Sequence, residues 1–125
     1  MGIMEKMRLD GKAVFVTGGA RGIGMNYARA VAEAGADVAI VDMDIDTARK
    51  TAETLAAETG RKCIAIGCDV TDPVSVNALI DTFMDTFGHL DAAFCNAGIC
   101  INVPAEEMTY ECWKKVIDVN LNGIS

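Results

Sequence analysis

The sequence Val-Phe-Val-Thr-Gly-Gly-Ala-Arg-Gly-Ile-Gly, residues 14–24, decides the fold. Its apolar start predicts a short strand, the glycines predict a turn, and a helix is expected to begin near Ile23. Such a turn brings backbone N–H groups and the positive end of a helix dipole to one place, which suits a pyrophosphate. Gly18 lets the chain turn sharply away from the strand. Gly22 and Gly24 have no Cβ, so a ligand and the neighbouring strand can both approach closely.

The spacing of the glycines separates this turn from two other phosphate-binding motifs. Gly18, Gly22 and Gly24 form the pattern G-x-x-x-G-x-G, which differs from the usual dinucleotide fingerprint G-x-G-x-x-G. A P-loop is excluded because no Lys-Ser or Lys-Thr follows the glycines. A glycine cluster after a strand is often only a turn, so the dinucleotide interpretation depends on the strand before it and the amphipathic helix after it.

Strands and helices are expected to alternate along the chain, and we interpret residues 1–125 as one domain. Near-continuous apolar strands between helices are typical of a parallel sheet with helices on both faces. Right-handed crossovers then predict a doubly wound, Rossmann-type α/β fold with strand order 3-2-1-4 and a ligand at the carboxyl ends of strands one and four. The expected strands are 13–17, 37–41, 63–67 and 90–95; the expected helices are 22–34, 45–59, 73–87 and one that begins near residue 105 or 109.

Composition argues against several kinds of partner and site. The chain has 125 residues, of which 51% are hydrophobic, and a formal net charge of −7, which argues against nucleic acid and anionic membrane surfaces as main partners. No apolar run approaches the ~20 residues of a membrane-spanning helix, and no secretory signal is evident. The sequence has five cysteines without a Cys-x-x-Cys pair and a single histidine, His89. It therefore offers few ligands for a zinc site. We therefore expect reduced thiols in a cytoplasmic protein.

Residues 17–24 resemble the cofactor motif of the short-chain dehydrogenase/reductase family. Further family landmarks follow in the right order: Asp42, Asp69-Val70, Asn96-Ala97-Gly98 and Asn120. The resemblance extends from about Leu9 to the end of the chain. It implies hydride transfer between NAD(P) and a secondary alcohol or ketone, such as a sugar or polyol, in an enzyme that we expect to be a homo-oligomer.

Two residues of opposite charge bear on the choice of cofactor. Asp42 lies at the end of the second expected strand, 18 residues after Gly24 and close to the offset of about 20 at which an acidic group meets the adenosine ribose. Its carboxylate would accept hydrogen bonds from the ribose hydroxyls and repel a 2′-phosphate, whereas Arg21 could pair with that phosphate. We weigh Asp42 more heavily and predict NAD rather than NADP. The alternative is that Asp42 is a solvated loop acid, since Asp44 and Asp46 follow it.

The resemblance implies further cofactor contacts at Ile23, Asp69, Val70, Asn96 and Gly98. Asp69 would accept a hydrogen bond from the adenine amino group, with Val70 packed nearby. The alternative is that Asp69 caps the turn before residues 71–73. Asn96 would line the cofactor cleft, although Cys95 replaces the first Asn of the pattern Asn-Asn-Ala-Gly that is common in the family. We expect Cys95 to be a packing residue rather than a nucleophile.

Catalytic residues are expected to lie mostly outside this sequence. The resemblance assigns Asn120 a role in holding a water in a proton relay, and the alternative is a polar residue on a solvent-facing side of a helix. The family's catalytic Ser and Tyr-x-x-x-Lys belong to the half that follows, so we expect this sequence to supply the cofactor-binding half and to be inactive alone. Tyr110 and Lys114 have the right spacing, but they precede Asn120 in the wrong order, and we interpret them as ordinary helix residues.

Two alternatives to an enzyme remain open: a non-catalytic dinucleotide-binding module, and a fragment that binds nothing without further sequence. The expected fold is also incomplete relative to the family. We therefore expect the strand at 90–95 to be an exposed edge of the sheet, prone to association with another chain.

Overall fold

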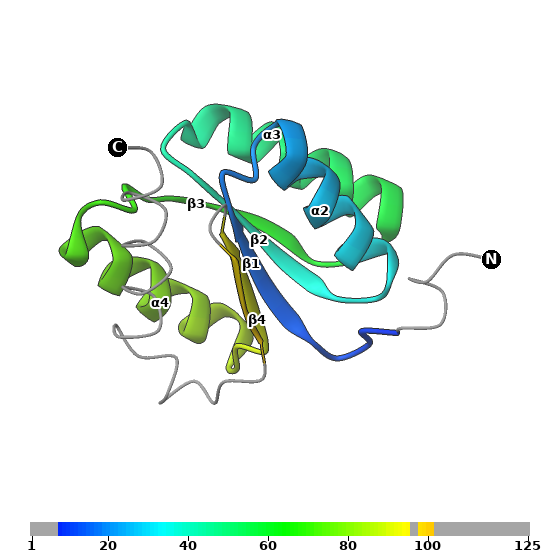
Figure 1. Cartoon of the computed structure of the whole chain (residues 1–125). Coiled ribbons are helices and arrows are strands. Elements are labelled where there is room, and N and C mark those ends of the chain that lie inside the picture. Colours follow the sequence, from blue (N-terminus) through cyan, green and yellow to red (C-terminus); the bar gives the residue numbers. More distant parts are fainter. Residues whose placement is uncertain (1–7, 96–97, 102–125) are drawn as a thin grey trace.

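The computed structural model describes residues 8–95 and 98–101, which form a five-stranded sheet with helices on both faces (Figure 1). The elements are β1 (Ala13–Thr17), α2 (Gly22–Glu33), β2 (Asp37–Asp42), α3 (Ile45–Thr59), β3 (Cys63–Gly67), α4 (Pro73–Phe87), β4 (Ala92–Cys95) and β5 (Gly98–Ile101). The strand order is β3-β2-β1-β4-β5. Helices α2 and α3 cover one face of the sheet, and α4 covers the other. The predicted doubly wound α/β fold and its order 3-2-1-4 are confirmed.

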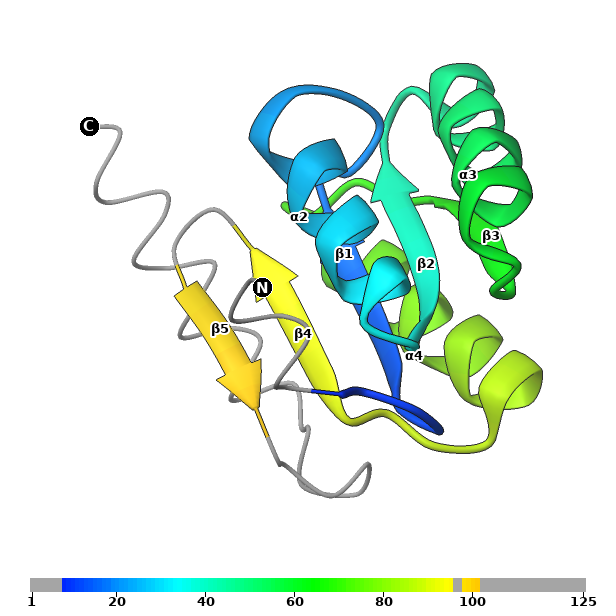
Figure 2. The same cartoon turned by 90° about the vertical axis from the view of Figure 1, so that its right-hand side faces the viewer.

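Parallel pairing brings the carboxyl ends of the first three strands to one edge of the sheet. β1 pairs in parallel with β2 and with β4, and β2 pairs in parallel with β3. In this register Thr17 lies opposite Val41, and Asp42 lies opposite Gly67. The segments that follow these strands therefore gather at the same edge, where doubly wound folds bind their ligands (Figure 2).

The core consists of two layers, one on each face of the sheet, because successive strand residues point to opposite faces. Phe15 packs in the α4 layer, where its ring meets the ring of Phe83 edge-on at a centroid distance of 5.7 Å. Its neighbour Val16 packs in the other layer, against α2 and α3, with Ile40 and Leu55. Burial on both faces explains why β1 and β2 are apolar along nearly their whole length.

Helices α3 and α4 begin and end as their sequences predict. Asp44 and Asp72 are the N-caps, and each side chain accepts a hydrogen bond from a backbone N–H of the first turn. Gly60 and Gly88 follow the last turns in the left-handed conformation, with φ of 71° and 81°. Helix α2 differs, because no side chain caps it.

The prediction of an exposed edge at β4 is wrong. β5 pairs with β4 in an antiparallel register, from Ala92 opposite Ile101 to Cys95 opposite Gly98. Only two residues separate the strands, which is too few for a parallel crossover but enough for a reversal. β4 also begins two residues later than predicted. Asp91 instead exchanges hydrogen bonds with Ala13, through its backbone N–H and its carboxylate. The helix expected near residue 105 or 109 lies outside the described residues.

Candidate functional site

The turn between β1 and α2 has the shape that its glycines predict. Gly18 and Gly22 are left-handed, with φ of 64° and 65°, a conformation that side chains disfavour. A Cβ added at position 22 would meet no atom within 4 Å, so this part of the turn faces open space. A Cβ at Gly24 would lie 2.2 Å from the carbonyl oxygen of Gly18. The third glycine therefore lets the first turn of α2 lie directly against the preceding loop.

The N-terminus of α2 is open to an anion. Arg21 occupies the N-cap position in an extended conformation, but its side chain makes no capping hydrogen bond, and the first turn contains no acidic residue. The first N–H groups of a helix have no partner within the helix and carry the positive end of its dipole. Ile23, at the same end, is 79% exposed. Because no side chain of its own turn satisfies these donors, this end suits a phosphate.

Asp42 lies directly beside the glycine turn, as the dinucleotide interpretation requires. Its Oδ2 accepts a hydrogen bond from the backbone N–H of Ala20 at 3.3 Å, and its Oδ1 accepts one from Asp44 N–H at 3.0 Å. The turn is further fixed by Thr51, whose buried hydroxyl donates to the carbonyl of Ala20 at 2.6 Å. A carboxylate oxygen has two lone pairs, so both oxygens of Asp42 keep acceptor capacity for a ligand hydroxyl.

Arg21 is already bound to the start of α3. Its guanidinium donates to Asp44 Oδ2 at 2.5 Å and to the hydroxyl of Thr47 at 3.2 Å. Asp44 in turn accepts from the backbone N–H and the hydroxyl of Thr47, at 3.1 and 2.7 Å. The hydrogen bonds from Thr47, and to a lesser degree Arg21, lower the pKa of Asp44. Sequence reasoning missed this pairing, although an Asp just before a helix-forming segment is an N-cap signal.

A hollow of about 260 Å³ lies at the ends of β2 and β3, next to Asp42. Six residues line it: Met43, Ile45, Gly67, Cys68, Asp69 and Ser75. Met43 is 72% exposed, which is unusual for a large apolar side chain. Sequence reasoning missed Met43 and Ile45, because a single apolar residue after a strand carries no distinctive signal. A partly apolar hollow bordered by a carboxylate suits a flat heteroaromatic ring with an amino group.

Asp69 closes the turn before α4, which is the alternative role that its sequence position allows. Its Oδ1 accepts from the backbone N–H and the hydroxyl of Thr71, at 2.9 and 2.7 Å, and these bonds lower its pKa. The carboxylate thus closes the turn before α4 and also borders the hollow. Val70 is partly buried and packs against the core layer on the α4 side of the sheet.

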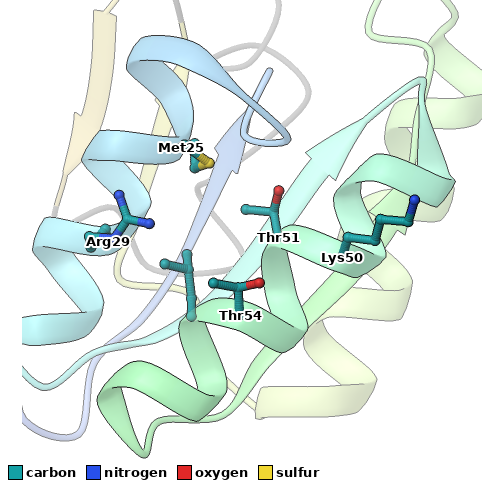
Figure 3. Close-up of a pocket in the computed structure, with 6 residues that line it drawn as sticks. Met25, Arg29, Lys50, Thr51 and Thr54 are labelled. Atoms are coloured by element: carbon teal, nitrogen blue, oxygen red, sulfur yellow. The ribbon is translucent and has the colours of Figure 1, made fainter.

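A second, smaller hollow lies between α2 and α3, and none of the predicted site residues lines it (Figure 3). It has a volume of about 120 Å³, and its lining includes Met25, Arg29, Thr51 and Thr54. The guanidinium of Arg29 is paired with Glu58 at 3.1 Å. We interpret this hollow as a polar seam between the two helices.

Other sequence predictions concern residues at or beyond β4. Gly98 is the first residue of β5, opposite Cys95 in the register. Burial raises the pKa of the Cys95 thiol to about 11. Asn96, Asn120, Tyr110 and Lys114 lie outside the described residues. Within residues 8–95 and 98–101, no cluster of His, Cys, Asp or Glu could hold a metal ion, and no helix is long and apolar enough to cross a membrane.

Comparison with known proteins gives the family. Residues 12–125 match the short chain dehydrogenase family. The chain belongs to the short-chain dehydrogenase/reductase family. It is 39% identical over 117 residues to a sorbitol dehydrogenase of Cereibacter sphaeroides, and this match covers 94% of the chain and 44% of that enzyme. The chain thus spans less than half the length of this curated relative.

Solved structures of short-chain dehydrogenases also superpose on this chain over part of their length. A hydroxysteroid dehydrogenase from Escherichia coli superposes with a TM-score of 0.70 at 34% identity, over 75% of this chain and 40% of that one. A short chain dehydrogenase from Burkholderia cenocepacia, solved in complex with NADP, superposes with a TM-score of 0.62 at 44% identity, over 67% of this chain and 34% of that one.

Proposed function

We propose that this chain is the dinucleotide-binding part of an oxidoreductase that transfers a hydride between NAD and a secondary alcohol or ketone. The observation that carries the proposal is the hydrogen bond from Ala20 N–H to the carboxylate of Asp42. It joins an acid at the end of β2 to the glycine turn after β1. The carboxylate that would bind the ribose hydroxyls therefore lies beside the turn that would bind the pyrophosphate, as a dinucleotide requires.

Three groups of residues would each bind one part of the dinucleotide. The backbone N–H groups of residues 22–24, at the uncapped start of α2, would bind the pyrophosphate. The remaining lone pairs of Asp42 would accept hydrogen bonds from the adenosine ribose hydroxyls. The hollow bordered by Met43 and Asp69 would hold the adenine. Val70, which follows Asp69 and packs against the core, would lie nearby, as the family resemblance implies. Once bound, the nicotinamide supplies the hydride chemistry.

The remaining family positions complete the proposed site. Ile23 lies at the exposed start of α2, where it would contact the cofactor beyond the pyrophosphate. Asn96 and Gly98 follow β4 in sequence and would line the nicotinamide end of the cleft. Asn120 would hold a water in the proton relay. The Ser and Tyr-x-x-x-Lys of the family would come from further sequence, so we expect no turnover from this chain alone.

Asp42 is the reason for proposing NAD. A carboxylate that accepts from the 2′-hydroxyl would face a 2′-phosphate with like charge. Family membership does not decide between NAD and NADP, because the relative from Burkholderia cenocepacia was solved with NADP. The named substrate of the Cereibacter sphaeroides relative, sorbitol, supports a small polyol or related alcohol as the substrate class. We further propose a cytoplasmic homo-oligomer.

Amide chemical shifts would test the binding proposal directly. NAD added to the ¹⁵N-labelled full chain should shift the amides of Ala20, Gly22, Gly24 and Asp42. The amides of Arg29 and Thr54, which line the second hollow, should shift much less. Shifts centred on that second hollow, or no shifts at millimolar NAD, would refute the proposed site.

A further inference from the structure

The ion pair between Arg21 and Asp44 borders the proposed ribose site. The two backbone donors to Asp42 are Ala20 and Asp44, and Arg21 directly follows Ala20 in the chain. The pair therefore connects the glycine turn to the start of α3 beside the carboxylate. Arg21 is the cationic side chain at this edge that sequence reasoning matched to a 2′-phosphate.

Asp44 is well placed to hold this arginine. Its carboxylate caps α3 and accepts two hydrogen bonds from Thr47, so its orientation is set before Arg21 binds. Thr47 also accepts a hydrogen bond from the arginine. Exposed ion pairs usually contribute little to stability, because two long side chains must be ordered. Here one partner is already ordered by the helix cap, which reduces that entropic cost.

We propose that Asp44 is a positioning residue that determines coenzyme specificity by withholding Arg21 from a 2′-phosphate. The inference rests on the proposed dinucleotide site. Asp44 would disfavour the binding of NADP in two ways. Arg21 must leave Asp44 and Thr47 before it can pair with the phosphate, and the negative charge of Asp44 repels that phosphate. Selection against NADP is thus shared between Asp42 and Asp44, although only Asp42 would touch the ribose.

The test compares two single substitutions that remove the same charge. Asp44→Asn keeps an oxygen that can cap α3 but weakens the hold on Arg21. Asp46→Asn, two residues further on, removes a charge whose side chain is 85% exposed and contacts Arg49 instead. Calorimetric titration of the full chain with NAD and with NADP gives the ratio of the two dissociation constants. We expect D44N to shift this ratio toward NADP by about five- to tenfold, and D46N by less than about twofold.

Substitution of Arg21 separates this mechanism from a general charge effect. In the unsubstituted background, Arg21→Ala should change NADP affinity by less than about twofold, because the arginine is already occupied. In the D44N background, the same substitution should remove most of the gain in NADP affinity. Thr47→Val, which removes a hydroxyl from the same network, should shift the ratio in the same direction as D44N, but less.

The outcomes distinguish this inference from the function on which it rests. If the chain binds NAD, and D44N and T47V both leave the ratio unchanged, the inference is wrong and the dinucleotide site stands. The inference is equally wrong if R21A alone weakens NADP binding about tenfold, because Arg21 would then already serve the phosphate. If the unsubstituted chain binds neither NAD nor NADP, the proposed function and the inference both fail.

Discussion

Gly24 packs against the carbonyl oxygen of Gly18, so closely that a Cβ at position 24 would lie 2.2 Å from that oxygen. The contact holds the first turn of α2 directly over the loop that leaves β1. The direction of the helix dipole relative to the loop therefore depends on the absence of one methyl group. This contact is the structural basis of the proposed pyrophosphate site.

The Gly24→Ala substitution should weaken dinucleotide binding as well as reduce stability. The added methyl must push the backbone of residue 18 away, since no flexible side chain can yield, and overpacking of this kind costs roughly 1–3 kcal/mol. We expect at least a tenfold loss of NAD affinity by calorimetry and a lower urea midpoint. Gly60→Ala is the control: residue 60 is left-handed, and a Cβ added there would meet no atom within 4 Å, so stability should fall while affinity stays within twofold. Equal affinity in both variants would contradict the role assigned to Gly24.

The hydrogen bonds that Thr71 donates should set the ionisation of Asp69. They lower its pKa below the ordinary 3.8, so Thr71→Val, which removes the hydroxyl and keeps the backbone N–H, should raise the pKa part of the way back. A lowered carboxyl pKa stabilises the fold above the ordinary value, and this contribution is lost as the pH falls through the lowered pKa. Carboxyl ¹³C titration by NMR measures the shift. An unchanged pKa in T71V would show that the hydroxyl is not the main cause.

The thiol of Cys95 should stay protonated and unreactive well above neutral pH. Burial raises its pKa from 9.0 to about 11, and a hydrogen bond with Thr17 offsets only part of that shift. Because the folded pKa is the higher one, this group stabilises the fold below about pH 9, and the contribution is lost as the pH rises toward 11.

Site-resolved alkylation would test this at pH 8. Iodoacetamide should label Cys95 much more slowly than the half-buried Cys63 in the folded chain, and the two should react at similar rates in urea. Rapid labelling of Cys95 in the folded state would contradict a packing role and favour a reactive thiol beside the cleft.

Local signals were sufficient to predict helices α2, α3 and α4 and the first three strands. Asp72 and Pro73 determine the start of α4, and Gly88 its end, through backbone conformations that neighbouring residues do not override. The strands β1 and β2 lie at the predicted positions because they are buried on both faces, which leaves an apolar signature. β3 also lies where it was predicted, although only Ile66 is fully buried in it. Strand order followed from the right-handed crossover rule.

Two pairings could not be predicted: that of β5 with β4, and that of Arg21 with Asp44. Nothing in residues 98–101 indicates that this segment reverses and pairs with β4, since pairing depends on a free edge as much as on sequence. The partner of Arg21 was missed for a similar reason. Asp44 meets it because the register of Thr17 opposite Val41 places the two loops side by side, and register is set by the whole sheet.

The role of Asp42 is the central claim, and titration of an Asp42→Asn variant with NAD tests it most directly. The amide keeps the size of the side chain and one acceptor but loses the charge and one acceptor oxygen for the ribose diol. We expect NAD affinity to fall at least tenfold in D42N, while D46N binds within twofold of the unsubstituted chain. Equal NAD affinity in D42N and D46N, with both variants folded by circular dichroism, would contradict the proposed site.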